Sequence, residues 1–195
     1  MEIQPNLILE NSIVQLRPLQ FSDVDNFLEF SENEPEIWKY SLIKPDGKAN
    51  LENYLNIALK ARDAKTEFPF IVFDKRTQKY AGSTRFYDIN FDFKTIQLGY
   101  TWYGKNFQGT GLNKNCKYLL LEYAFETLEM DRVEFRADRN NAKSIAAMKS
   151  IGCQVDGILR NNMPNADNSR RSSIVLSILR EEWFENVKEE LRKKL

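Results

Sequence analysis

The order of hydrophobic and polar residues along the chain predicts a succession of strands and helices. Apolar runs typical of strands occupy residues 12–17, 68–73, 80–87, 95–103, 132–138, 153–160 and 172–179. Apolar residues recur at helical spacing from residue 22 onward and within 48–65, 112–128, 141–151 and 180–194. This order predicts a mixed α/β fold with one main sheet of about six to seven strands flanked by helices.

Local patterns sharpen some of these boundaries. Ser22 stands where an N-cap would precede the first helix, and Gly152 stands where a C-terminal cap would end the helix over 141–151. Residues 161–171 are polar and are expected to form a loop between the last two strands. The strand over 95–103 alternates strictly, so we expect its two faces to be formed by Ile96, Leu98, Tyr100 and Trp102 and by Gln97, Gly99, Thr101 and Tyr103.

The composition is typical of one globular domain spanning residues 1–195. The chain has 195 residues, 28 Lys+Arg, 28 Asp+Glu, no His and two Cys, and 42% of its residues are hydrophobic. The absence of His excludes a Ser-His-Asp triad and removes the commonest metal ligand, and two Cys alone cannot build a zinc site. We therefore expect no metal. A net charge of zero argues against a nucleic-acid binder.

The N-terminal residues lack the basic start and the long apolar core of a signal peptide. The longest apolar stretches, such as 118–121, are far too short to span a membrane. We therefore expect a cytoplasmic protein with no membrane partner and with reduced thiols at Cys116 and Cys153. The alternative is a secreted protein in which these two cysteines form a disulfide bond.

The segment over 95–114 carries the clearest chemical signal, because a strand runs into a glycine-containing loop that opens a helix. The start of a helix presents unpaired backbone N–H groups and the positive end of the helix dipole. Gly109 and Gly111 leave this loop without bulky side chains, so a phosphate could approach the backbone closely. The alternative is that the two glycines serve a tight turn and nothing else.

The loop sequence Q-G-T-G-L-N (108–113) resembles the acyl-CoA pyrophosphate loop of the GNAT N-acetyltransferases. The N-x-x-S of residues 141–144, the opening LRPLQFSDVDNF and the closing SILREEW are similar to the RimJ/RimL branch, the ribosomal-protein alanine and serine acetyltransferases. The resemblance implies a GNAT fold with a mostly antiparallel sheet. It also implies transfer of an acetyl group from acetyl-CoA to a primary amine in a ternary complex; a homodimer is common among such proteins.

The resemblance assigns roles to particular residues. The donor to the thioester oxygen would be a backbone N–H near Tyr103, and the donor to the departing thiolate would be Ser144. The acetyl-CoA site would comprise Thr101, Trp102, Tyr103, Gln108, Gly109, Thr110, Gly111, Leu112, Asn113, Asn141 and Ser144. The acceptor pocket would draw on Trp38, Tyr40, Tyr87 and Gln97, although each of the three aromatic residues could equally belong to the core. The acidic run over 23–36 would attract an ammonium group or remain a solvated helix face.

Two departures from the family pattern bear on catalysis. Met148 stands where many relatives have a Tyr that protonates the thiolate, and Gln97 stands where many have a Glu that helps to deprotonate the amine. A site without a strong base suits an α-amine better than a Lys side chain. We therefore expect a peptide or protein N-terminus as acceptor. The alternatives are a small-molecule amine such as an antibiotic, a polyamine or an amino acid, or a non-catalytic acyl-CoA sensor.

Overall fold

The computed structural model describes residues 2–165 and 169–195 and contains one large sheet. The described strands follow the order β1-β2-β3-β4-β5-β6-β8-β7, and all neighbours are antiparallel except β5 and β6, which run parallel. The strands are β1 (Leu9–Glu10), β2 (Val14–Pro18), β3 (Phe68–Asp74), β4 (Lys79–Asn90), β5 (Thr95–Tyr103), β6 (Arg132–Asp138), β7 (Gln154–Pro164) and β8 (Arg170–Leu179).

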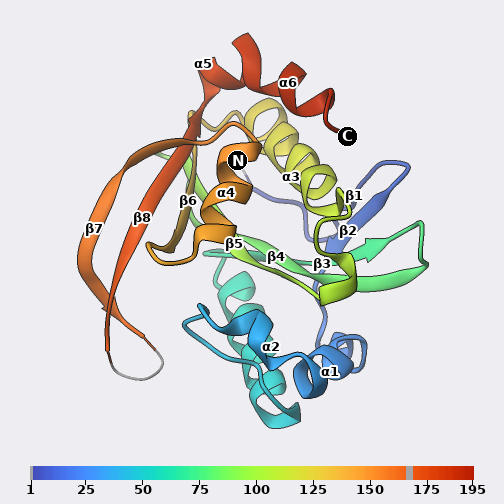
Figure 1. Ribbon diagram of the computed structural model, residues 1–195. Helices are drawn as coiled ribbons and strands as arrows, with labels where there is room; N and C mark the ends of the chain where they lie inside the picture. Colours follow the sequence, from blue (N-terminus) through green and yellow to red (C-terminus); the bar gives the residue numbers. More distant parts are fainter. Residues whose placement is uncertain (1, 166–168) are drawn as a thin grey trace.

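Helices cover both faces of this sheet (Figure 1). One face is covered by α1 and α2, and α3 lies against the other, with α4 beside it and the C-terminal helices following the last strand. The helices are α1 (Val24–Asn33), α2 (Lys48–Asp63), α3 (Leu112–Glu122), α4 (Ala142–Ser150), α5 (Arg180–Glu182) and α6 (Lys188–Arg192). Short 3-10 turns cover Phe21–Asp23, Pro35–Trp38 and Lys105–Phe107, and π-helical turns cover Tyr123–Thr127 and Trp183–Val187.

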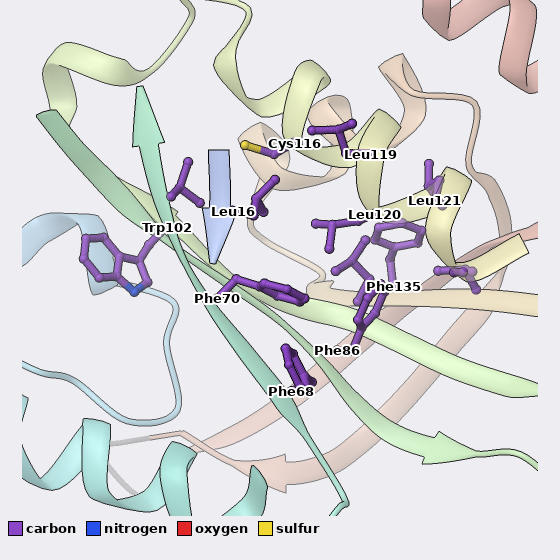
Figure 2. Close-up of a cluster of buried hydrophobic side chains, with 14 of the residues drawn as sticks. Leu16, Phe68, Phe70, Phe86, Trp102, Cys116, Leu119, Leu120, Leu121 and Phe135 are labelled. Carbon is purple, nitrogen blue, oxygen red and sulfur yellow. The ribbon is translucent and has the colours of Figure 1, made fainter. Parts of the chain in front are cut away.

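The hydrophobic core lies on both faces of the sheet. On the α3 side, Leu120 lies over Phe86 of β4 and Phe135 of β6, and all three side chains are buried (Figure 2). On the α1 side, Trp102 packs against Phe27 with ring centroids 4.8 Å apart. The predicted mixed α/β fold with a central sheet is therefore confirmed. No described helix is long and apolar enough to span a membrane.

Some predicted boundaries are wrong. The sheet has eight strands rather than six to seven, because the two-residue strand β1 is too short to leave a periodic pattern. Ser22 is not the N-cap of α1; Asp23 occupies that position, and its carboxylate accepts a hydrogen bond from the backbone N–H of Gln20 at 2.8 Å. The predicted polar loop over 161–171 is shorter, since β7 extends to Pro164 and β8 starts at Arg170; residues 166–168 of that loop lie outside the described part.

The predicted strict alternation along β5 is also wrong beyond Gly99. The pairing with β4 shifts there, because Ser83 faces Trp102 whereas Arg85 faces Gly99, which leaves one extra residue on β5. Tyr100 is the residue at which the strand bulges, and its φ is +49°. Before the bulge, Leu98 lies with its β4 partner Phe86 on the α3 side of the sheet. After the bulge the alternation is shifted by one residue, so that Trp102 packs on the α1 side.

Candidate active site

The glycine loop before α3 presents free backbone donors to open space. Gly109 and Gly111 have φ values of +74° and +84°, which favour glycine, and a Cβ built on either would meet nothing within 4 Å. Gly111 is the N-cap of α3 and offers no side chain to the first turn. Among the described residues, none accepts a hydrogen bond from the backbone N–H groups of residues 109–113. These N–H groups and the helix dipole form a site suited to an anion.

The turn between β3 and β4, which the sequence analysis did not single out, stabilises the glycine loop. Arg76, between β3 and β4, donates to the backbone oxygen of Thr110 at 3.0 Å. The same guanidinium forms an ion pair with the buried Asp74 at 2.8 Å, which fixes its position. The hydroxyl of Thr110 donates to the backbone oxygen of Phe107 at 2.8 Å. These contacts fix the loop in the conformation that exposes its N–H groups.

Gln108 joins the loop to two other parts of the predicted site. Its amide nitrogen donates to the backbone oxygen of Tyr103 at 2.7 Å, and its amide oxygen accepts a hydrogen bond from Lys143 Nζ on α4. Asn141 caps the N-terminus of α4, because its side chain accepts from the backbone N–H of Ser144 at 3.1 Å. The end of β5, the glycine loop and the first turn of α4 thus lie together.

The two parallel strands β5 and β6 share a short ladder. Their pairing covers Thr95–Gln97 opposite Arg132–Glu134, after which β6 continues along β8 and β5 continues along β4. Residues 98–103 of β5 therefore have no β6 partner within the described structure. An extended ligand could bond to this free strand edge as a neighbouring strand would.

Gln97, Tyr87 and Tyr100 lie together on the α2 side at the point where that ladder ends. Tyr87 is opposite Gln97 in the β4–β5 register, and its ring centroid is 5.1 Å from that of Tyr100. A Cβ built on Gly99 would lie 2.9 Å from the Tyr87 ring, so glycine there makes room for this tyrosine. The amide oxygen of Gln97 is buried without a hydrogen-bond partner among the described residues. Burial raises the pKa of the Tyr87 phenol above its usual value.

Tyr40 approaches the same region from the segment after α1. Its hydroxyl donates to the backbone oxygen of Asn140 at 3.3 Å, directly before the cap of α4. Arg171 of β8 donates to the backbone oxygen of Tyr40 at 3.1 Å and lies 4.0 Å from the carboxylate of Asp138. The segment that carries Tyr40 is therefore tied to both β8 and the start of α4.

The side chains of Trp38, Trp102 and Tyr103 lie in the core. Trp38 is 1% exposed and packs edge-on against Trp102, with ring centroids 5.1 Å apart. Tyr103 is buried on the α3 side, where burial raises the pKa of its phenol well above its usual value. Because the side chains of Trp102 and Tyr103 are buried, these two residues can offer a ligand at the unpaired edge of β5 their backbone N–H and C=O groups.

The acidic run over 23–36 is partly neutralised within the chain. Asp23 forms an ion pair with Arg17 at 2.6 Å and is 1% exposed. Glu34 accepts from the backbone N–H of Lys105 at 2.7 Å, and Glu36 pairs with the Lys105 ammonium. Fewer carboxylates of this run are therefore available to attract a basic substrate than the sequence pattern indicates.

Lys117 is a further residue that the sequence analysis missed. It lies on α3, is 5% exposed and donates to the hydroxyls of Thr101 at 2.7 Å and Thr84 at 3.1 Å. A sequence signal was present, because Lys117 precedes Leu120 by three residues on the apolar face of α3. Arg76 and Lys143 gave no such signal, since an isolated cation in a hairpin or on a helix surface is common.

The cysteines of the structure are free. Cys116 and Cys153 form no disulfide bond. Burial raises the pKa of Cys116 to about 11 and that of Cys153 to about 12. Both thiols therefore stay protonated at neutral pH and are poor nucleophiles.

Comparison with known proteins agrees with this geometry. The acetyltransferase (GNAT) domain family matches residues 14–154. The Bacillus licheniformis protein "Uncharacterized N-acetyltransferase p20" is 26% identical over 150 residues, which cover 74% of this chain and 81% of that protein. The Bacillus subtilis (strain 168) protein "Putative ribosomal N-acetyltransferase YdaF" is 33% identical over 90 residues, which cover 46% of this chain and 48% of that protein.

A solved structure shares the whole fold. The GCN5-related N-acetyltransferase from Brucella melitensis superposes with a TM-score of 0.89 at 24% identity, over 96% of this chain and 85% of that one. The chain belongs to the acetyltransferase (GNAT) domain family, and it is an N-acetyltransferase.

Acetyl-CoA is the co-substrate that this family uses. The residues of the chain fit it in two places. The free N–H groups of residues 109–113 suit a pyrophosphate, and no side chain fills the space in front of Gly109 and Gly111. The unpaired edge of β5 suits the amide groups of an extended arm.

Proposed function

We propose that this protein transfers the acetyl group of acetyl-CoA directly to an amine of low pKa, in particular the α-amine of a peptide or protein N-terminus. The observation that carries the proposal is Gln97, an amide whose buried oxygen has no hydrogen-bond partner in the described part of the chain, at the point where β5 and β6 separate. An amide cannot take the proton of an ammonium group as a carboxylate does.

Three carboxylates on neighbouring elements already have partners. Glu67 is bonded to Arg85 at 2.6 Å. Glu134 pairs with two arginines at 3.0 and 2.7 Å, and Asp138 accepts from the backbone N–H of Asn140 at 2.8 Å. These three carboxylates are therefore already engaged with other groups of the protein. The acceptor is therefore expected to arrive as a neutral amine.

That requirement favours an α-amine over a lysine side chain. At pH 7 an α-amine with a pKa near 7.8 is neutral in roughly 10% of molecules, whereas a lysine near 10.4 is neutral in about 0.04%. The difference exceeds a hundredfold before any contact in the pocket is considered. The name of the YdaF relative, a ribosomal N-acetyltransferase, supports a protein acceptor.

The chain supplies binding, orientation and one proton donor. The glycine loop would bind the pyrophosphate, and a backbone N–H near Tyr103 would donate to the thioester oxygen, a contact worth about 3 kcal/mol in such transition states. Ser144, half-buried in the first turn of α4, would donate to the departing thiolate. Its hydroxyl bonds to no acceptor among the described residues, and the cap from Asn141 fixes its backbone.

The experiment is a thiol-release assay with acetyl-CoA and a panel of acceptors. The panel contains peptides that begin with Ala, Ser or Met, the same peptides with a blocked N-terminus and an internal Lys, free amino acids, polyamines and aminoglycosides. We expect turnover with free N-termini and none with the blocked peptides. The rate should rise with pH up to the pKa of the peptide amine and then level off.

Other outcomes would replace the proposal. Turnover confined to polyamines or aminoglycosides would indicate a small-molecule acetyltransferase. Acetyl-CoA binding by thermal shift without turnover on any amine would indicate an acyl-CoA sensor. The absence of a thermal shift would contradict acetyl-CoA as the co-substrate of this chain.

A further inference from the structure

Lys117 is a buried cation that donates hydrogen bonds to two neutral hydroxyls. Its ammonium group lies on the sheet side of α3 and has no carboxylate within ion-pair distance among the described residues. Burying a charge without an opposite charge is costly, and such groups persist mainly where they have a task. The hydroxyls of Thr84 and Thr101 are the partners of this ammonium, at 3.1 and 2.7 Å.

The hydroxyls of Thr84 and Thr101 both lie beside the bulge in β5. Their oxygens are 2.8 Å apart, and each also lies near the backbone oxygen of Gly99, at 3.5 Å for Thr84 and 3.4 Å for Thr101. Because Lys117 donates to both hydroxyl oxygens, one hydroxyl is left to donate to the other, and the second is left to donate to the backbone oxygen of Gly99. The ammonium therefore orients a small network that ends on the residue before Tyr100.

The opposite face of the bulge is held by a second buried cation. The guanidinium of Arg85 lies 4.1 Å from the centre of the Tyr100 ring and pairs with Glu67 at 2.6 Å. Tyr100 is thus fixed by its ring on the α2 side, and its neighbours Gly99 and Thr101 are fixed through Lys117 on the α3 side. A strand segment with a partner on one side alone needs such support, since β6 does not pair with residues 98–103.

We propose that Lys117 is a positioning residue for the thioester end of acetyl-CoA. Acting through Thr101 and Thr84, it holds the bulge so that the free backbone groups of β5 keep one orientation toward the bound arm. Lys117 touches neither the co-substrate nor the acceptor in this scheme. The inference rests on the proposed use of acetyl-CoA at this edge.

The scheme separates two parts of the co-substrate. The nucleotide end would bind to the glycine loop, which Arg76 and Gln108 hold without any contact from Lys117. The thioester end would bind at the strand edge that Lys117 orients. A substitution at Lys117 should therefore weaken the binding of acetyl-CoA. It should leave unchanged the affinity for adenosine 3′-phosphate 5′-diphosphate, the nucleotide fragment that lacks the pantetheine arm.

The experiment measures both dissociation constants by calorimetry for the wild type, Lys117→Met, Thr101→Val and the double variant. Lys60→Met is the matched control, since Lys60 is an exposed lysine on α2. In Lys117→Met we expect the Kd for acetyl-CoA to rise about tenfold, a loss equivalent to one hydrogen bond of about 1.4 kcal/mol. The Kd for the nucleotide fragment should stay within a factor of two of the wild-type value, about the scatter of such measurements.

The double variant tests the route. If Lys117 acts through Thr101, the double variant should be no weaker than the worse single variant, because the two changes remove the same link. Fully additive losses would contradict that route. Equal weakening of both ligands in Lys117→Met would show a general structural defect and overturn the inference, as would unchanged affinity for both. A wild type that binds neither ligand would instead refute the proposed function itself.

Discussion

Replacing Lys117 with methionine should make the protein more stable. Methionine has a similar length and no charge, so Lys117→Met removes the cost of burying an ammonium group in the core. The Thr84 and Thr101 hydroxyls are 2.8 Å apart and remain partners for each other, so no buried polar group is left unpaired. A merely structural lysine would give the opposite result, since its loss would destabilise the fold.

The size of the effect follows from the pKa of Lys117. Burial lowers this pKa from 10.5 to about 8. Between these values the unfolded chain binds a proton that the folded chain has released, so the stability of the wild type rises with pH across this window. The variant lacks this contribution. The free energy of unfolding of Lys117→Met should therefore exceed that of the wild type by about 3 kcal/mol at pH 7 and by about 1 kcal/mol at pH 9.5.

The measurements are urea unfolding, which gives the free energy of unfolding, and thermal unfolding of the wild type, Lys117→Met and the control Lys60→Met at both pH values. At pH 7 the melting temperature of Lys117→Met should be about 6–12 °C above that of the wild type. In the folded state the neighbouring thiols of Cys116 and Cys153, whose pKa values burial raises to about 11 and about 12, stay neutral in this range. Their ionisation in the unfolded chain is common to the wild type and the variant and cancels in the comparison. A less stable Lys117→Met, or a difference that does not shrink with rising pH, would refute the reasoning.

The remaining predictions concern the acetyl-CoA loop, the proton donor and the base. Gly111→Val should abolish acetyl-CoA binding in calorimetry without unfolding the protein. The control Gly47→Val introduces similar backbone strain, at a φ of +78°, and should bind acetyl-CoA normally. Retained binding in Gly111→Val would place the phosphate site elsewhere. Ser144→Ala should lower kcat by about tenfold to a hundredfold with an unchanged Kd for acetyl-CoA, and an unchanged kcat would remove this hydroxyl from the mechanism. Gln97→Glu should supply a base and raise kcat/KM for lysine side chains relative to α-amines; an unaltered ratio of the two substrates would show that position 97 does not face the amine.

Much of the fold was predictable from local patterns. The strand over 132–138 has the predicted bounds, and the helix over 48–65 is observed as Lys48–Asp63. Gly152 follows Ile151, the C-cap of α4, and has a φ of +103°, as a glycine that ends a helix should. These features depend on residue spacing and on backbone preferences, which a sequence displays directly. The glycine loop was predictable for the same reason.

The bulge in β5 was not predictable, because the apolar and aromatic residues over 95–103 fit a regular strand. The extra residue at Tyr100 results from pairing with β4 and from the packing of its ring over Arg85. Register depends on the neighbouring strand and not on the strand itself. The face on which Trp102 lies therefore had to come from the tertiary structure.

The sequence by itself determined the order of elements, the glycine loop before α3 and the family resemblance, since each of these is encoded in residues close together in the chain. The tertiary structure alone decided which distant residues share the site. It brought Lys143 to Gln108 across 35 positions, Arg76 to Thr110 across 34, and Lys117 to Thr84 across 33. Such contacts arise when strands pair and helices pack over them, and no local preference of the residues involved predicts them.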